Sequence, residues 1–128
     1  MKEEHGEGAR VYAELRVAAK ATEMQELAQG IGAEAVIADL SLEFVFGKVW
    51  GRGGLDRKQR SLVTIAVLIA LRQTAELENH FRIGLTNGLT QAEIEEAIVQ
   101  TAPYAGFPAA WSAAKAFSAL DEPADDQR

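Results

Sequence analysis

Apolar residues recur along most of the chain at intervals of three and four, which places them on one face of an α-helix. Glycine, proline and capping residues interrupt this pattern, whereas the strict alternation that marks a strand is rare. The chain is therefore expected to be all-α and to form one compact domain over 1–128. About six helices are predicted, over 8–29, 33–50, 57–71, 76–86, 91–103 and 108–120.

Two of these helices have reciprocal capping residues at their starts. Asp56 is followed three residues later by Gln59, and Thr90 by Glu93, so each pair can satisfy two backbone amides that a helix N-terminus leaves open. The apolar run 62–71 contains many β-branched residues, which leaves a strand as the rival interpretation. The preceding cap and the length of the run favour a helix, and a helix that is apolar all round is expected to be central.

The other boundaries rest on single residues. Gly30 should end the first helix, Asn87 and Gly88 the fourth, and Pro103 should kink or end the fifth. The acidic stretch 121–128 is expected to be a solvated tail. Short side chains in the last helix predict close packing against a neighbouring helix; they belong to Ala109, Ala110, Ala113, Ala114 and Ala116.

Composition narrows the possible partners. A formal charge of −6 with scattered basic residues disfavours binding to nucleic acid or to an anionic membrane. The absence of cysteine excludes disulfides, thiolate nucleophiles, iron–sulfur ligation and thiol peroxidase chemistry. The run 62–71 has about half of the roughly 20 residues that span a bilayer. The N-terminal sequence MKEEHGEGAR lacks the basic and apolar pattern of a signal peptide, so a cytoplasmic location is expected.

Candidate chemistry centres on His80, because the second histidine, His5, lies in an acidic terminus. On a helix, Glu76 lies four residues earlier on the same face, close enough to orient the imidazole. On spacing alone, an ordinary contact between a surface histidine and a glutamate is the more common outcome. One histidine and one carboxylate fall short of the three protein ligands of a catalytic zinc, so no metal site is expected.

The stretches VWGRGGLDRKQRSLVTIAVLIAL and ELENHFRIGLTNGLTQAEIEEAIVQTAPYAGFPAA closely resemble the body of the carboxymuconolactone decarboxylase family, over about 44–117. The resemblance implies an alkylhydroperoxidase-like helical fold and a homo-oligomer, commonly a hexamer built as a trimer of dimers. The related alkylhydroperoxidase branch has a CxxC pair where this chain has Gln73 and Glu76, and an upstream glutamate where it has Ser61. Glu76 in place of the second cysteine is similar to the decarboxylase branch.

That branch implies decarboxylation without a cofactor of a small carboxylated lactone, such as 4-carboxymuconolactone, in aromatic compound catabolism through the β-ketoadipate pathway. His80 would be the proton donor and Glu76 would orient it. Lys48 or Arg82 would bind the substrate carboxylate. The aromatic residues near helix ends are more often core residues than ligand contacts, but Trp50 and Tyr104 are candidates for the pocket wall.

Two departures from the family pattern keep other functions open. Lys48 stands where the family's decarboxylases usually have a glutamate, which inverts the local charge, and the family's N-terminal segment is hard to find between Val17 and Ala38. One alternative is a related lyase or isomerase that acts on another acidic metabolite. The other is a non-enzymatic, oligomeric binding protein in which His80 and Glu76 form a structural pair.

Overall fold

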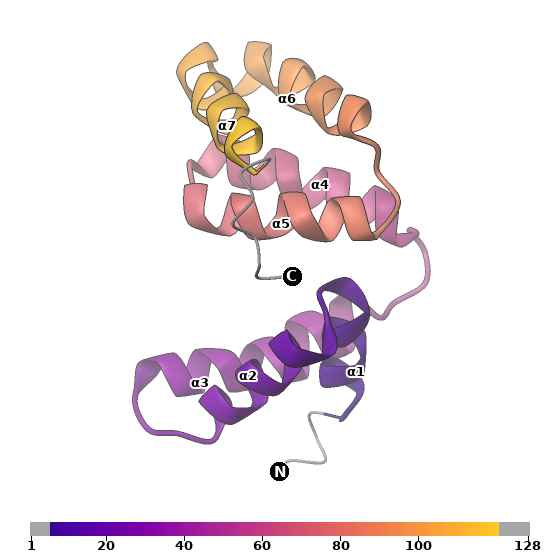
Figure 1. Cartoon of the computed structure of the whole chain (residues 1–128), viewed down its shortest axis with the longest axis vertical. Helices are drawn as coiled ribbons and strands as arrows, with labels where there is room; N and C mark the ends of the chain where they lie inside the picture. Colours follow the sequence, from indigo (N-terminus) through magenta and orange to yellow (C-terminus); the bar gives the residue numbers. More distant parts are fainter. Residues whose placement is uncertain (1–5, 121–128) are drawn as a thin grey trace. The chain divides into compact units, whose positions relative to one another are not determined.

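The computed structural model describes residues 6–120, and within them every regular element is a helix, as predicted (Figure 1). The chain divides into two compact units, with the boundary between Leu55 and Asp56. The first unit contains α1 (Gly6–Leu15), α2 (Ala18–Ala28), α3 (Ala33–Leu40) and the π-helix η2 (Ser41–Val49). The second contains α4 (Arg57–Leu71), α5 (Thr74–Thr86), α6 (Gln91–Ala105) and α7 (Phe107–Ala119). The predicted acidic tail, 121–128, lies outside the described residues.

The prediction of one helix over 8–29 is wrong. The chain breaks after α1, and Val17 has an extended backbone with φ −161° and ψ 164°. The break lets α1 pack against η2 while α2 packs against α3, so the two halves cover different parts of the same partner. No glycine or proline occurs at this position. We therefore attribute the break to tertiary packing and not to a local helix breaker.

The predicted helix over 33–50 is confirmed as α3 and η2, which follow one another without a gap. Its last nine residues form a π-helix, a form that the sequence pattern did not indicate. Leu42 and Phe46 are buried on its inner face, and the ring of Phe46 lies 4.6 Å from that of Tyr12 between centroids. Gly8 of α1 lies against the carbonyl of Leu42, so close that a Cβ at this position would overlap it. The missing side chain therefore allows α1 to reach η2.

In the second unit, α4 begins at Arg57 as predicted. Asp56 accepts a hydrogen bond of 2.8 Å from the Gln59 amide, and Gln59 accepts one of 3.0 Å from the Asp56 amide. The rival strand interpretation is wrong, and α4 packs against α5, α6 and α7, which makes it the central helix of its unit. The same helix nevertheless exposes apolar side chains on one face of the unit; they belong to Val63, Val67 and Leu71.

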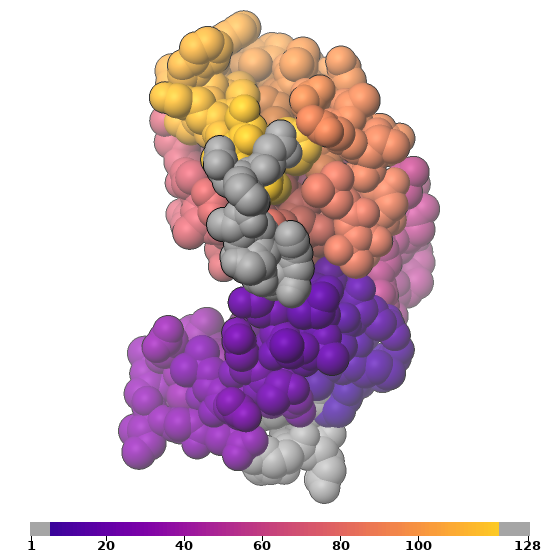
Figure 2. Space-filling model, in the orientation of Figure 1, coloured from indigo at the N-terminus to yellow at the C-terminus, as the bar shows by residue number. Residues whose placement is uncertain are grey.

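The later helices follow the sequence signals with two exceptions. Gly88 and Gly106 have φ values of 103° and 105°, in the region that favours glycine, and they follow the ends of α5 and α6. Pro103 does not end α6, which continues to Ala105. In α7, the short side chains of the predicted packing face are buried, except that of Ala114, which is exposed. In the space-filling view, α6 and α7 adjoin as the orange and yellow surface (Figure 2).

The core of the second unit converges on Gly84 in α5. A Cβ at this position would lie 3.0 Å from Leu89 Cδ1, 3.4 Å from Ile65 Cδ1 and 3.7 Å from Ile94 Cδ1. Since all three side chains are buried, a larger residue would have to push apart three segments of the core. The absence of a side chain at Gly84 thus allows α4, α5 and the start of α6 to approach closely.

Replacing Gly8 by alanine should destabilise the first unit by about 1–3 kcal/mol, because the new methyl group overlaps the Leu42 carbonyl. Gly6→Ala is the matched control, since a Cβ there has no neighbour within 4 Å. Urea denaturation followed by circular dichroism measures both changes. Equal stability of the two variants would show that the close approach of α1 to η2 does not contribute.

Candidate functional site

His80 lies on the buried face of α5, not on the surface. It shares a stripe at helical spacing with Leu77, Phe81 and Gly84, all buried, and α5 packs this side against α4 and α7. The residue is 7% exposed, and its Nδ1 atom is shielded from solvent. A surface histidine, the common alternative from spacing, is therefore wrong for this residue.

Glu76 is brought to the imidazole as the spacing predicted. Its Oε1 lies 3.9 Å from Nε2 of His80, too far for a hydrogen bond but close enough for electrostatic attraction to a protonated ring. The side chain of Glu76 is 63% exposed and that of His80 only 9%. Nε2 is thus the ring atom that lies toward an exposed carboxylate, whereas Nδ1 lies inside the packing.

A second polar contact fixes the helix that carries His80. Asn87, directly after α5, donates from Nδ2 to Ser61 Oγ at 2.9 Å and to the Arg57 carbonyl at 3.3 Å. Ser61 is fully buried on α4, so solvent water cannot form a hydrogen bond with its hydroxyl. Asn87 was predicted to end the helix and belongs to the stretch that resembles the family. The partners are 26 and 30 residues away, so no local pattern could have found the contact.

The other predicted site residues belong to another face of α5, to α6 or to the first unit. Arg82 follows it by two residues, which on a helix points to a different face. Lys48 and Trp50 belong to the first unit, where Lys48 is exposed in the last turn of η2 and Trp50 is buried. Within the second unit, Glu76 and His80 lie next to one another.

Tyr104 lies at the C-terminal end of α6 and is 84% exposed. It lines an apolar groove of about 360 Å³ between α4 and α6. The other lining residues are Ala66, Val67, Ala70, Gln100, Thr101 and Ala105. Tyr104 therefore lies in mainly apolar surroundings. Neither His80 nor Glu76 lines this groove.

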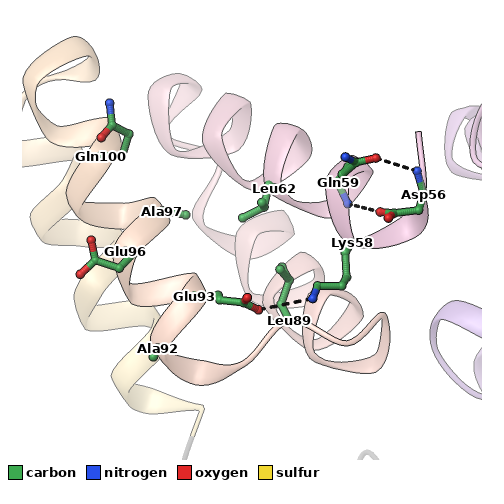
Figure 3. Close-up of a pocket in the computed structure, with 10 residues that line it drawn as sticks. All are labelled: Asp56, Lys58, Gln59, Leu62, Leu89, Ala92, Glu93, Glu96, Ala97 and Gln100. Atoms are coloured by element: carbon green, nitrogen blue, oxygen red, sulfur yellow. Dashed lines mark hydrogen bonds and ion pairs between the residues drawn. The ribbon is translucent and has the colours of Figure 1, made fainter. Parts of the chain in front are cut away.

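A larger cavity of about 640 Å³ lies between α4 and α6 (Figure 3). Asp56 and Gln59 of the first capping box and Glu93 of the second border it, and Lys58 Nζ lies 3.8 Å from Glu93 Oε1. No sequence pattern predicts this cavity, although the two capping signals mark the starts of the helices that line it. Its ionisable residues are one lysine and three acids, Asp56, Glu93 and Glu96, a formal charge of 1 − 3 = −2 that disfavours an anionic substrate.

Within residues 6–120, no group of three histidine, cysteine, aspartate or glutamate residues lies close enough to hold a metal ion. In the same part of the chain, no helix is long and apolar enough to cross a membrane.

Comparison with known protein families matches residues 36–119 to the carboxymuconolactone decarboxylase family. The chain belongs to that family. The match begins in α3 and ends in α7, so it includes Lys48, Glu76 and His80. Membership confirms the resemblance that the two sequence stretches indicated.

Individual relatives are similar over about half of the chain. A 4-carboxymuconolactone decarboxylase from Acinetobacter baylyi is 52% identical over 66 residues, which are 52% of this chain and 49% of the relative. A nitrosuccinic acid decarboxylase from Metarhizium robertsii is 46% identical over 70 residues, 55% of this chain and 49% of the relative. An uncharacterised 15.0 kDa protein from Paracoccus denitrificans is 41% identical over 70 residues, which are 53% of this chain and 52% of the relative. The chain thus spans about half the length of the curated relatives it matches.

Asn87→Ala should lower stability by about 1–2 kcal/mol, because it leaves the buried Ser61 hydroxyl without this hydrogen bond. A double-mutant cycle with Ser61→Ala, measured by urea denaturation, isolates the coupling between the two side chains. Strict additivity of the two changes would mean that the contact does not hold α5 to α4.

Proposed function

We propose that this chain is a decarboxylase that needs no cofactor and acts on a small carboxylated lactone such as 4-carboxymuconolactone, in aromatic compound catabolism. The observation that carries the proposal is the family match over 36–119 together with the Glu76–His80 pair that α5 holds inside it. The similarity to a curated protein named for this reaction supports the substrate.

The proposed reaction relies on the substrate as its own electron acceptor. When the carbon–carbon bond to the carboxylate breaks, carbon dioxide leaves and the electron pair spreads through the ring double bond onto the lactone carbonyl. A proton delivered to carbon then completes the enol-lactone. The protein has only to orient the ring, stabilise the developing oxyanion and supply that proton.

His80 is the proposed proton donor, and Nε2 is the atom that donates. This nitrogen lies toward Glu76, whose carboxylate favours the protonated ring by electrostatic attraction and keeps it in place. A cation is needed for the substrate carboxylate, and we assign this role to Lys48 or Arg82. Trp50 and Tyr104 are proposed to contribute apolar wall.

A second candidate is decarboxylation of a different acidic metabolite by the same residues. One relative is named for nitrosuccinic acid, and Lys48 departs from the glutamate usual in the family's decarboxylases. A carboxylate beside a nitro group fits the same chemistry, because the nitro group can take up the electron pair as the lactone does. Turnover of nitrosuccinate but not of 4-carboxymuconolactone would favour this candidate.

We further propose that the whole chain, 1–128, works as one functional domain within a homo-oligomer, a hexamer built as a trimer of dimers. The family resemblance supports the hexamer. The many large apolar side chains exposed on the isolated chain support self-association in general.

His80→Gln should reduce turnover of 4-carboxymuconolactone roughly 10²–10⁴-fold, the usual contribution of a positioned general acid. Glu76→Gln should cause a smaller loss, because it acts through the imidazole. Glu78→Gln, an exposed change on the same helix, is the matched control and should leave the rate unchanged. Spectrophotometric loss of substrate measures all three, with circular dichroism to verify folding. Unchanged turnover in His80→Gln would contradict the assignment and favour a non-enzymatic binding protein.

Lys48→Ala and Arg82→Ala should separate the two candidates for carboxylate binding. Loss of the residue that pairs with the carboxylate should raise KM roughly tenfold or more with little change in kcat. The other substitution should behave like Lys115→Ala, an exposed change on α7. Initial rates over a range of substrate concentrations measure both constants, and an unchanged KM in both variants would refute the assignment.

A further inference from the structure

The two cavities between α4 and α6 adjoin one another at Gln100, which lines both of them. The larger cavity, of about 640 Å³, lies toward the starts of the two helices (Figure 3), and the smaller one, of about 360 Å³, lies toward their ends. We call the two cavities together the α4–α6 groove. Neither Glu76 nor His80 lines the groove, so it is a different site from the proposed catalytic pair.

The groove follows most of the length of both helices. On α4, its lining residues extend from Lys58 to Ala70, which are roughly 18 Å apart along the helix axis. Many of the lining positions hold alanine, whose short side chain leaves space between the two helices. These alanines are Ala66 and Ala70 on α4 and Ala92, Ala97 and Ala105 on α6. The groove is therefore elongated, and it suits a linear ligand better than a compact one.

The two ends of the groove differ in charge. The larger cavity has Leu62 and Leu89 on its wall together with one lysine and three acids, so it has an excess of two negative charges. Among the described residues that line the smaller cavity, none is charged at neutral pH, and most are apolar. A ligand that matches both ends has a cation at one end and an apolar chain behind it.

The side chain of Lys58 shows how an alkylammonium group fits the acidic end. Its methylene carbons lie against the backbone of Gly88, because a Cβ on that glycine would lie 3.4 Å from Lys58 Cδ and 3.6 Å from Lys58 Cγ. Its Nζ atom lies 3.8 Å from Oε1 of Glu93, so the side chain links α4 to α6 (Figure 3). The excess of two negative charges already includes this ammonium group, so a ligand ammonium would meet a net attraction.

We propose that the α4–α6 groove binds an amphipathic aliphatic amine. The ammonium group lies beside Glu93 and Glu96, and the hydrocarbon chain follows the groove toward Ala70. The charge of one end and the apolar lining of the other select this class of ligand. The site does not depend on the proposed decarboxylation.

Three compounds with the same chain and different head groups test the proposal, namely n-octylamine, n-octanol and octanoate. In calorimetric titrations of the full chain, the amine should bind roughly tenfold more tightly than the alcohol, because only the amine pairs with the carboxylates. Octanoate should bind most weakly, because the acidic end repels it. Equal affinity for the amine and the alcohol, or no binding of the amine, would overturn the proposal.

The length of the chain provides a second comparison. n-Hexylamine, which is shorter by two methylene groups, should bind roughly tenfold more weakly than n-octylamine if the chain is buried in the groove. The same affinity for both amines would show that the chain stays in solvent and would contradict the proposed binding mode.

Charge variants show whether the attraction is local. Glu96→Gln should weaken binding of n-octylamine roughly twofold to fivefold, the usual contribution of an exposed ion pair. Glu78→Gln removes an equal charge from an exposed position outside the groove and should leave the affinity unchanged. An equal loss in both variants would indicate diffuse attraction to an acidic protein and would refute the assigned site.

A substitution at the apolar end locates the chain of the ligand. Ala70→Phe should fill this end of the groove and weaken binding of n-octylamine at least fivefold, and its exposed position on α4 favours correct folding. Val63→Phe is the matched control, because Val63 is exposed on the same helix but does not line the groove. Circular dichroism verifies the helical content of both variants. Wild-type affinity in Ala70→Phe would show that the chain lies elsewhere.

Discussion

The packing of α5 against α4 is the constraint on which the second unit depends. Gly84 lets the two helices and the start of α6 approach closely, and Asn87 joins the end of α5 to Ser61 on α4 through a buried hydrogen bond. Since one face of α5 is buried, the helix cannot rotate without exposing its apolar side chains or leaving polar groups unsatisfied. His80 therefore has a fixed orientation, set by packing and not by a hydrogen bond to Glu76.

This fixed orientation gives the two ring nitrogens different surroundings. Nδ1 is enclosed by the helix packing, and Nε2 lies toward an exposed carboxylate. An imidazole held in this way can carry a proton at one defined atom without a metal or an organic cofactor, provided that the substrate accepts its own electrons. Two relatives are named as decarboxylases, one for 4-carboxymuconolactone and one for nitrosuccinic acid. The proposed decarboxylation, which needs a proton donor but no cofactor, is therefore compatible with this pair of residues.

The first unit contributes differently. Its longest continuous helix, α3 with η2, buries one apolar face and leaves large apolar side chains of another face exposed, and Lys48 lies in its last turn.

Sequence alone determined the features that depend on neighbours three or four residues apart. The capping boxes at Asp56 and Thr90, the glycine at 88 and the Glu76–His80 pair are all local, so their geometry follows once a helix forms. Family membership could also be predicted, because the spacing of a long motif survives in the sequence itself.

Tertiary structure decided the rest, because it depends on residues far apart in the chain. The break at Val17 has no local breaker and follows from the positions of α1 and α2 on their shared partner. The contact between Asn87 and Ser61 spans 26 residues. Burial of His80 and exposure of Tyr104 depend on which helix faces meet, and periodicity shows that a face is apolar without showing what covers it.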